Sequence, residues 1–356
     1  DPELVTELFD AGLMAIEIPE AYGGAGRGLF DVVLAIEEIA RVDPAVAVFV
    51  DVQNALVNSA ILRHGSGDLK RRYLLRMAAG TVGAYAISEE EAGSDAFAMA
   101  TVAQRDGQHH VLSGRKKWTT NAAEAGAFLV FARQQDATAD AGRITAFLVD
   151  RDTPGLGIGT RVDKLGIRAS STCDLILDHV RVPAANVIGQ SGLGELLAVD
   201  TLTIGKIGIA AQLVGLASGA LDAAVSYAQR RHQFGQPIAN FQGVQFPLAA
   251  LAAELSAARA LLYDTVRLVD DGPPSRDLVT AAAMTKHIAA EVAERTAAHA
   301  VETLGGNGFT RDHPVEKFYR DAKVGKIYEG TTNMQFRTIA AALLRAGDAG
   351  PREVGA

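Results

Sequence analysis

The second half of the sequence is dominated by long alanine-rich segments with helical periodicity. Four of them, at about residues 204–231, 243–270, 278–304 and 314–346, are separated by short connections. Long helices joined by short loops are typical of a helical bundle. The sequence therefore predicts a C-terminal four-helix bundle.

In the part of the chain before the bundle, the pattern of apolar residues changes once, from helix-like to strand-like. Up to about residue 82, apolar residues recur at helical spacing. Beyond it, short runs rich in Val, Ile, Phe and Leu are separated by Gly, Pro, Asp and Asn, as in antiparallel strands. We therefore expect an α+β fold, because alternating βαβ units, which a doubly wound nucleotide-binding sheet needs, are absent. The expected parts are an N-terminal α-helical domain at 1–82, a middle antiparallel β domain at 83–194, the four-helix bundle domain at 195–346, and a flexible tail at 347–356.

Composition excludes several classes of function. The net charge of −8 and the pI of about 5.5 argue against nucleic acid as a partner. A single cysteine, Cys173, excludes an internal disulfide and a cysteine-based metal site. We find no apolar run that approaches the roughly 20 residues that a membrane span needs, and expect no membrane partner. A cytoplasmic location is expected, with the mitochondrial matrix as an open alternative because the first methionine is Met14.

Near its end, the sequence places one acid between an aromatic ring and a glycine. A short charged helix leads into Tyr328-Glu329-Gly330. A carboxylate with apolar neighbours loses hydration, so its pKa rises toward the range of a general base. Gly330 allows backbone conformations that other residues avoid, and lets a ligand approach closely. Taken alone, Glu329 is better explained as an exposed acid at a helix end.

Other stretches contain residues that suit a flat aromatic cofactor. The only tryptophan, Trp118, could stack on such a ring, and Ser88 ends a predicted strand with a hydroxyl. Between two long helices, Arg231 could bind a diphosphate while Phe234 covers apolar ring surface. The glycines that begin at Gly305 follow a helix, and do not form a Rossmann fingerprint because no strand precedes them. Each stretch also has a purely structural interpretation.

Taken together and in this order, these stretches resemble the acyl-CoA dehydrogenase family over nearly the whole chain. The matching segments are 85–95, 116–121, 163–168, 180–183, 231–235, 305–308 and 320–330. Within the family, the sequence is most similar to the short/branched-chain (2-methylacyl) branch, through residues 51–54, 149–155, 168–173 and 314–317. The resemblance implies an FAD flavoprotein oxidoreductase that acts on CH–CH groups of acyl thioesters (EC 1.3.8.-), in fatty acid or polyketide metabolism. It also implies a homotetramer or homodimer and an electron-transfer flavoprotein as electron acceptor.

The same resemblance assigns roles to individual residues. Glu329 would be the catalytic base, and the end of the bundle would hold the diphosphate and adenosine of a neighbouring subunit's FAD. The cofactor-binding residues that it implies are Tyr85, Ile87, Ser88, Ser94, Trp118, Thr119, Thr120, Arg231, Phe234, Gln242, Glu302, Gly305, Gly306, Thr331 and Asn333. The substrate-binding residues that it implies are Ser94, Thr203, Lys206, Tyr328 and Gly330.

The sequence departs from the family on the expected substrate side. Lys206 stands where the family usually has arginine, and loses the planar fork of the guanidinium. Ile204 replaces an acid, Glu195 an aromatic residue, and Glu90 and Glu91 small residues. These changes indicate an altered acyl pocket. An unusual biosynthetic acyl group, a thioester on a carrier protein and desaturation at the γ,δ position all stay open.

Two rival functions are compatible with the same residues. A flavin-dependent oxidase or monooxygenase could use the same fold, because fold alone does not determine chemistry. A flavoprotein without enzymatic activity is the second rival. Glu329 favours a dehydrogenase over both, since a general base is needed to remove a proton next to a thioester.

Overall fold

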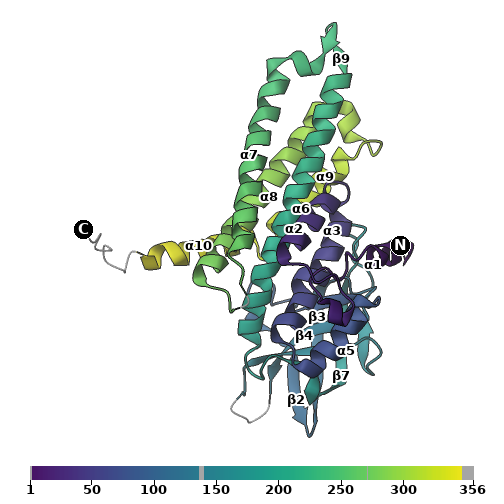
Figure 1. Cartoon of the computed structure of the whole chain (residues 1–356), viewed down its shortest axis with the longest axis vertical. Coiled ribbons are helices and arrows are strands. Elements are labelled where there is room, and N and C mark those ends of the chain that lie inside the picture. The colour runs from purple at the N-terminus through teal and green to yellow at the C-terminus, as the bar shows by residue number, and fades with distance from the viewer. Residues whose placement is uncertain (1, 136–139, 271, 347–356) are drawn as a thin grey trace, which may run out of the picture.

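The computed structural model describes residues 2–135, 140–270 and 272–346, and the predicted tail at 347–356 lies outside them. A helical region, a β-sheet and long helices follow one another along the chain (Figure 1). The helices are α1 Pro2–Asp10, α2 Leu29–Ala40, α3 Pro44–Asp51, α4 Ser59–His64, α5 Gly67–Ala78, α6 Gly194–Arg230, α7 Gln242–Arg267, α8 Arg276–Leu304, α9 Val315–Ala322 and α10 Thr332–Ala346. The strands are β1 Gly83–Ala86, β2 Val102–Asp106, β3 His109–Thr120, β4 Ala127–Gln134, β5 Ile144–Asp150, β6 Leu156–Ile158, β7 Thr172–Pro183, β8 Val187–Ile188, β9 His232–Gln233 and β10 Gln236–Pro237. The predicted α+β fold is confirmed.

A π-helical turn, Val52–Asn58, joins α3 to α4 without a break and carries buried amide side chains. Asn54 Nδ2 donates to the Leu13 carbonyl at 2.8 Å, and Asn58 Nδ2 donates to the Met14 carbonyl at 3.0 Å. These bonds attach the loop after α1 to the helix. Such π-helical segments frequently occur next to functional sites, where they redirect side chains.

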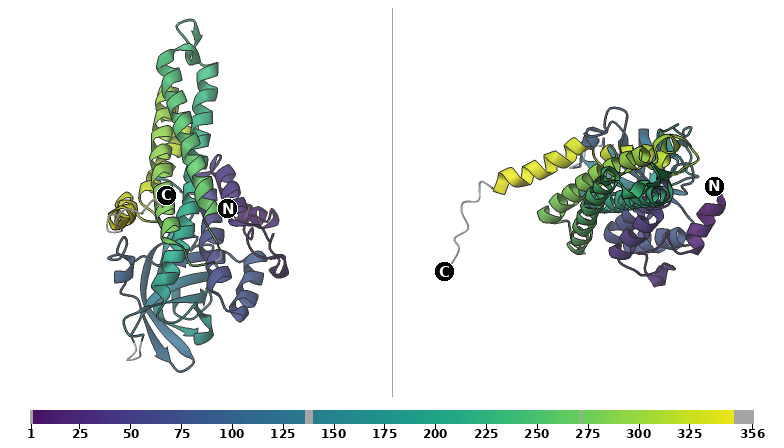
Figure 2. Two further views of the ribbon diagram at one scale, coloured as in Figure 1. Left: turned by 60° about the vertical axis from the view of Figure 1, so that its left-hand side comes forward. Right: turned by 90° about the horizontal axis from the view of Figure 1, so that it is seen from above.

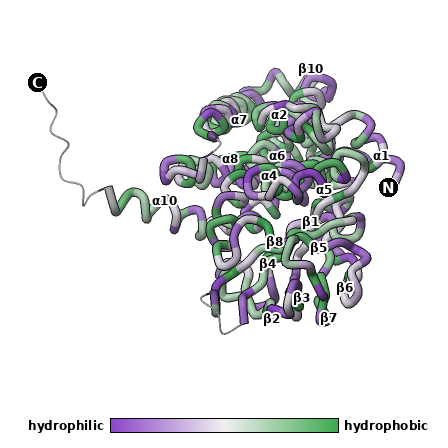
Figure 3. The backbone as a smooth tube through the Cα atoms, turned by 60° about the horizontal axis from the view of Figure 1, so that its bottom comes forward, coloured by the Kyte–Doolittle hydropathy of each residue, from purple (hydrophilic) through white to green (hydrophobic). Residues whose placement is uncertain are grey.

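The large sheet has the strand order β6-β7-β3-β2-β4-β5-β8, with β1 also paired to β4. Most neighbours are antiparallel, as predicted, but β1 and β2 each run parallel to β4. Along β7, Leu175, Leu177, Val180 and Val182 are buried, and the residues between them, which are polar except for Ile176, are exposed. Hydrophobic and hydrophilic stretches lie next to one another along the backbone of the sheet (Figure 3).

The helices α6, α7 and α8 form a rod that extends away from the sheet (Figures 1 and 2). Helix α6 packs against α2, α7 and α8. Glycines permit its closest contacts with the N-terminal helices, since a Cβ atom on Gly215 would lie 2.1 Å from the Glu37 carbonyl oxygen. The N-terminal helices are therefore attached directly to the bundle.

The last predicted bundle segment, 314–346, is not one continuous helix. It consists of α9, a 3-10 turn at Lys323–Lys326, a break, and α10, which projects from the body of the protein (Figure 2). At the break, Glu329 has φ 51° and Gly330 has φ 88°. These left-handed values cannot continue a right-handed α-helix.

Three helical stretches among the described residues are long and apolar enough to cross a membrane, by length and composition: Pro44–His64, Gly194–Arg230 and Gln242–Arg267. The expectation that no stretch reaches this length is therefore wrong. In the first two, 89% of the apolar window is buried inside the protein, against 22% in the third. Contacts within the protein thus use the apolar surface of the first two.

Candidate active site around Glu329

The break between α9 and α10 places the carboxyl group of Glu329 against α6. Its Oε2 atom is buried and has no hydrogen-bond partner among the described residues. A Cβ atom on Gly205 would lie 3.0 Å from this oxygen and 2.7 Å from Cδ2 of Leu56. The carboxyl group therefore fits here because residue 205 has no side chain.

Side chains from two helices hold the backbone of the break in place. Gln335 Nε2 donates to the carbonyls of Glu329 at 3.1 Å and Gly330 at 2.8 Å. From α8, Lys286 Nζ donates to the same Gly330 carbonyl at 2.8 Å. The Tyr328 hydroxyl donates to Gln212 Oε1 on α6 at 2.9 Å. A non-glycine residue with positive φ is strained, and these bonds stabilise it at position 329.

Burial raises the pKa of Glu329, while the charges of Lys206 and Lys286 act in the opposite direction. Burial also lowers the pKa of Lys206, and lowers that of Lys286 to about 8. Lys206 Nζ donates to the Leu202 carbonyl at 3.3 Å within α6. A desolvated carboxyl with cations to favour its ionised form is suited to accept a proton at neutral pH.

A second acid, Asp51, belongs to the same site. Its side chain is 0% exposed, and neither carboxyl oxygen has a hydrogen-bond partner among the described residues. Burial, and then the charge of Glu329, raise the pKa of Asp51 well above its ordinary value. In the sequence, Asp51 was noticed only as part of the family motif at residues 51–54. An acid inside the apolar run 45–57 was the signal that could have identified it.

A second group of predicted residues lies on β3. Trp118 is 54% exposed and has φ 61°, at an irregularity in the pairing of β3 with β7 between Lys116 and Thr119. Next to it, the hydroxyl of Thr119 is buried and has no partner among the described residues. Thr120 is half-buried. An exposed ring beside a partnerless hydroxyl fits a flat heterocycle with polar atoms at its edge.

A buried ion pair that the sequence analysis missed supports this region. Lys116 Nζ lies 2.7 Å from Glu89 Oε1 and donates to the Ile87 carbonyl at 3.1 Å. Glu89 also accepts from the backbone amides of Ala100 at 2.6 Å and Thr101 at 3.0 Å. Burial lowers the pKa of Lys116 to about 8, whereas the hydrogen bond and the charge of Glu89 act to raise it. The pair fixes the loop between β1 and β2 to β3.

The predicted residues on and after β1 have different surroundings. Tyr85 is buried, with its hydroxyl 2.9 Å from Thr201 Oγ1 and its ring 5.1 Å from that of Phe131. Ile87 is buried, Ser88 is half-buried and Ser94 is exposed. Tyr85 therefore packs in the core, whereas the two serines are accessible.

At the far end of the long helices, Arg231, Gly305 and Gly306 line one hollow of about 340 Å³ together with Tyr227 and Asn307. Phe234 lies on the adjacent β9–β10 hairpin and is 93% exposed, and Gln242 and Glu302 are exposed as well. The hairpin and the sheet lie at opposite ends of the molecule (Figure 1). Within one chain, these residues and the Trp118 region are therefore far apart.

The remaining predicted residues lie on α6 and α10. Thr203 is buried and its hydroxyl donates to the Val199 carbonyl at 2.7 Å. Thr331 Oγ1 accepts from the Met334 amide at 3.4 Å at the start of α10, and Asn333 is exposed. Thr203 thus supports its own helix, while the other two follow Glu329 directly.

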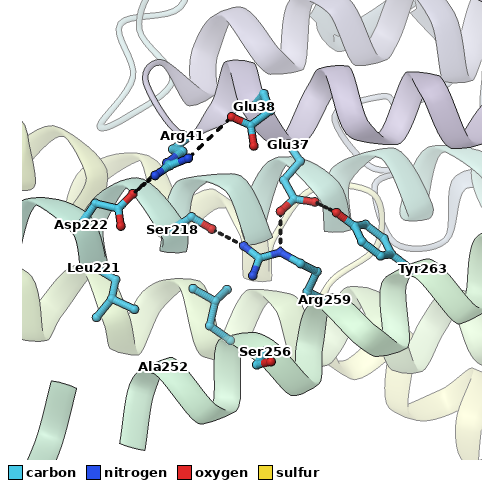
Figure 4. A pocket seen from close by; sticks show the side chains of 11 residues that line it. Glu37, Glu38, Arg41, Ser218, Leu221, Asp222, Ala252, Ser256, Arg259 and Tyr263 are labelled. Atoms are coloured by element: carbon cyan, nitrogen blue, oxygen red, sulfur yellow. Dashed lines mark hydrogen bonds and ion pairs between the residues drawn. The ribbon is translucent and has the colours of Figure 1, made fainter. Parts of the chain in front are cut away.

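A larger hollow of about 570 Å³ lies between α2, α6 and α7 (Figure 4). In it, Glu37 accepts from Arg259 Nε at 2.6 Å and from the Tyr263 hydroxyl at 2.8 Å. Arg41 Nε donates to Asp222 at 2.7 Å. These charges are paired with one another and join α2 to the bundle, which is a structural role.

Comparison with known proteins matches three family models to successive parts of the chain. They are the acyl-CoA dehydrogenase N-terminal domain at residues 1–81, middle domain at 84–180 and C-terminal domain at 192–344. A probable short/branched chain specific acyl-CoA dehydrogenase of Dictyostelium discoideum is 48% identical over 344 residues, covering 96% of this chain and 82% of the relative.

Solved structures show the same similarity. Butyryl-CoA dehydrogenase from Megasphaera elsdenii is 36% identical with a TM-score of 0.92, covering 97% of this chain and 90% of that one. The prolyl acyl carrier protein oxidase AnaB is 28% identical with a TM-score of 0.88, covering 95% and 89%.

Proposed function

Because this chain belongs to the acyl-CoA dehydrogenase family, we propose that it is an acyl-thioester dehydrogenase in which Glu329 removes the α-proton. Members of this family are FAD-dependent oxidoreductases that act on CH–CH groups. The product would be an enoyl thioester. The observation that carries the proposal is the half-buried Glu329, whose Oε2 atom is buried and has no partner among the described residues.

The residues around Glu329 account for its role as a base. Desolvation makes the carboxylate more basic, and Lys206 and Lys286 keep it ionised. The fixed 329–330 backbone would present the Glu329 amide to the thioester carbonyl, where negative charge develops as the α-proton leaves. FAD, when bound, would supply the acceptor for the hydride that leaves the β-carbon.

The residues present fit FAD at two places. Trp118, with the half-buried Thr120 and Ser88, would hold the ring system, and the partnerless hydroxyl of Thr119 lies next to them in the chain. Arg231 and the adjoining glycines would hold the diphosphate of a neighbouring subunit's FAD, since the two groups are far apart within one chain. This arrangement supports a homotetramer or homodimer. As the acceptor of electrons from the reduced flavin, we propose an electron-transfer flavoprotein.

The acyl group is short or branched in this proposal. The departures at Lys206 and Ile204 favour an unusual biosynthetic acyl group, a carrier-protein thioester or γ,δ desaturation. An anaerobic panel of saturated and 2-enoyl thioesters, on CoA and on a carrier protein, tests this by bleaching of the flavin. NMR of the product locates the new double bond. Ordinary turnover of 2-methylbutyryl-CoA would contradict the altered pocket, and no bleaching by any thioester would contradict a dehydrogenase.

A flavin-dependent oxidase or monooxygenase is the second candidate, and the similarity to a prolyl acyl carrier protein oxidase favours it. Reoxidation of the substrate-reduced flavin in air separates the two. Slow reoxidation supports the dehydrogenase, whereas rapid reaction with oxygen supports the oxidase. The cytoplasmic location stays a prediction, which fractionation of the source cells tests.

A further inference from the structure

Two carboxyl groups, those of Asp51 and Glu329, occupy the same face of α6. Gly205 and Gly208 are three residues apart, and residues at this spacing are neighbours on a helix surface. Glu329 Oε2 lies 3.0 Å from the Cβ position of Gly205, and Asp51 Oδ1 lies 1.8 Å from that of Gly208. Gly205 and Gly208 thus make room for two acids that are 278 residues apart in the sequence.

Asp51 is fully buried, Glu329 is half-buried with a buried Oε2 atom, and these oxygens lack the partners that a charged group needs. Glu329 Oε2 and both carboxyl oxygens of Asp51 have no hydrogen-bond partner within the described part of the chain. An isolated buried charge is costly, and neighbouring carboxyls that share a site do not both ionise readily. At neutral pH, one of the two groups is therefore expected to keep its proton.

The surrounding charges decide which group that is. Lys206 on α6 and Lys286 on α8 favour the ionised form of Glu329. The charge that acts on Asp51 is that of Glu329, which disfavours ionisation. The nearby Tyr328 hydroxyl is engaged by Gln212, and Asp321 on α9 is paired with Lys317 at 2.7 Å.

We propose that Asp51 and Glu329 form a carboxyl pair that holds one proton in the resting enzyme, with the proton on Asp51 and the charge on Glu329. This inference rests on the proposed role of Glu329 as the base. Asp51 is then a positioning residue: by staying neutral, it limits the site to one negative charge and leaves Glu329 free to accept the α-proton. When that proton reaches Glu329, both carboxyls are neutral and Asp51 retains its own proton.

Difference infrared spectroscopy of the folded holoenzyme at neutral pH tests the location of the proton. All proteins compared carry Glu17→Gln, because the pKa of Glu17 is about 7 and its carboxyl would add a band of its own. In this background the carbonyl stretch of a protonated carboxyl should be present with native Asp51 and lost in Asp51→Asn, whose amide is neutral and nearly isosteric. The matched control is Asp321→Asn, because Asp321 is equally buried but accepts from Lys317 and from the Ile167 amide at 2.5 Å. A band that survives in Asp51→Asn, or its absence from the wild type, overturns the proposal.

Glu329→Gln supplies a second measurement that does not depend on activity. Without the charge of Glu329, Asp51 should keep its band at neutral pH and lose it at a lower pH than in the wild type. Loss of the neutral-pH band in Glu329→Gln, but not in Asp51→Asn, would place the proton on Glu329 and overturn the proposal.

The pH profile of kcat/KM adds a kinetic test. In Asp51→Asn, the acid limb should stay at the wild-type pH, whatever the effect on kcat. If Asp51 were ionised in the wild type, its removal would move that limb to lower pH, which would contradict the proposal. If the wild-type profile has no acid limb, Glu329 is not the base and the proposed function fails. The infrared result, by contrast, tests only the protonation of Asp51.

Discussion

Oδ1 of Asp51 occupies the place where a side chain on residue 208 would begin, since a Cβ atom on Gly208 would lie 1.8 Å from it. Glycine is a poor helix former, so its presence inside α6 needs a packing reason. The reason is the close approach of α3 to α6, which brings Asp51 next to Glu329.

Gly208→Ala should therefore destabilise the protein by about 1–3 kcal/mol, because the added methyl group displaces a buried carboxyl. Urea unfolding measures the effect. The same substitution in an Asp51→Ala background should cost less, because the obstructing carboxyl is gone. An equal cost in both backgrounds would show that Asp51 is not the constraint.

Glu329→Gln should bind FAD and remain yellow, yet reduce its flavin about 10²- to 10⁴-fold more slowly, because an amide cannot accept the α-proton. Anaerobic stopped-flow spectroscopy with a thioester that the wild type oxidises measures the rate. The control is Glu291→Gln, which changes only a partly exposed ion pair with Lys326 at 2.9 Å. Similar rates for Glu329→Gln and the wild type would exclude Glu329 as the base.

Lys206→Met should move the acid limb of kcat/KM to higher pH. Lys206 lowers the pKa of Glu329, so its removal raises that pKa, and the ionised base forms only at higher pH. Lys206→Arg keeps the positive charge and should keep the limb near its wild-type position. If both variants shift the limb equally, geometry rather than charge is responsible.

Gly330→Ala should slow flavin reduction and destabilise the protein by about 1–3 kcal/mol, because residue 330 has φ 88°. Its Cβ atom would also lie 2.8 Å from Gln335 Nε2, which holds the break between α9 and α10. Gly243→Ala is the control, since nothing lies within 4 Å of the added atom and its φ is ordinary. If Gly330→Ala has the same unfolding temperature and the same rate of flavin reduction as the wild type, this account is contradicted.

Glu17 should make the protein less stable as pH rises. Burial raises the pKa of Glu17 from 4.5 to about 7, with Arg63 opposing the shift. The folded state therefore favours the protonated form, so stability is complete below about pH 4.5 and falls as pH rises through 7. The loss amounts to about 3 kcal/mol by pH 8.

Urea unfolding of the wild type and Glu17→Gln at pH 5 and pH 8 checks this effect. The variant should gain stability relative to the wild type at the higher pH, because a neutral amide has no charge to desolvate. A difference between the two proteins that is the same at both pH values would refute the prediction.

The local pattern of residues in the sequence was sufficient to predict much of the fold. Helical periodicity, strand-like runs and turn residues predicted the order of helical region, sheet and long helices, because these signals arise from neighbours along the chain. Gly330 was expected to allow unusual backbone conformations, although the break that it forms with Glu329 was not predicted within the helical segment 314–346. The family was recognised for the same reason, since its motifs are short and contiguous.

Only the tertiary structure decided the surroundings of Glu329. The charges of Lys206 and Lys286, the neutral neighbour Asp51 and the room beside Gly205 come from α6, α8 and α3, which meet only after folding. The proton affinity of a carboxyl depends on burial and on charges within several ångströms, and sequence distance does not encode either. The sequence by itself thus determined which residue is the acid, and the packing of distant helices determined how strongly that acid holds a proton.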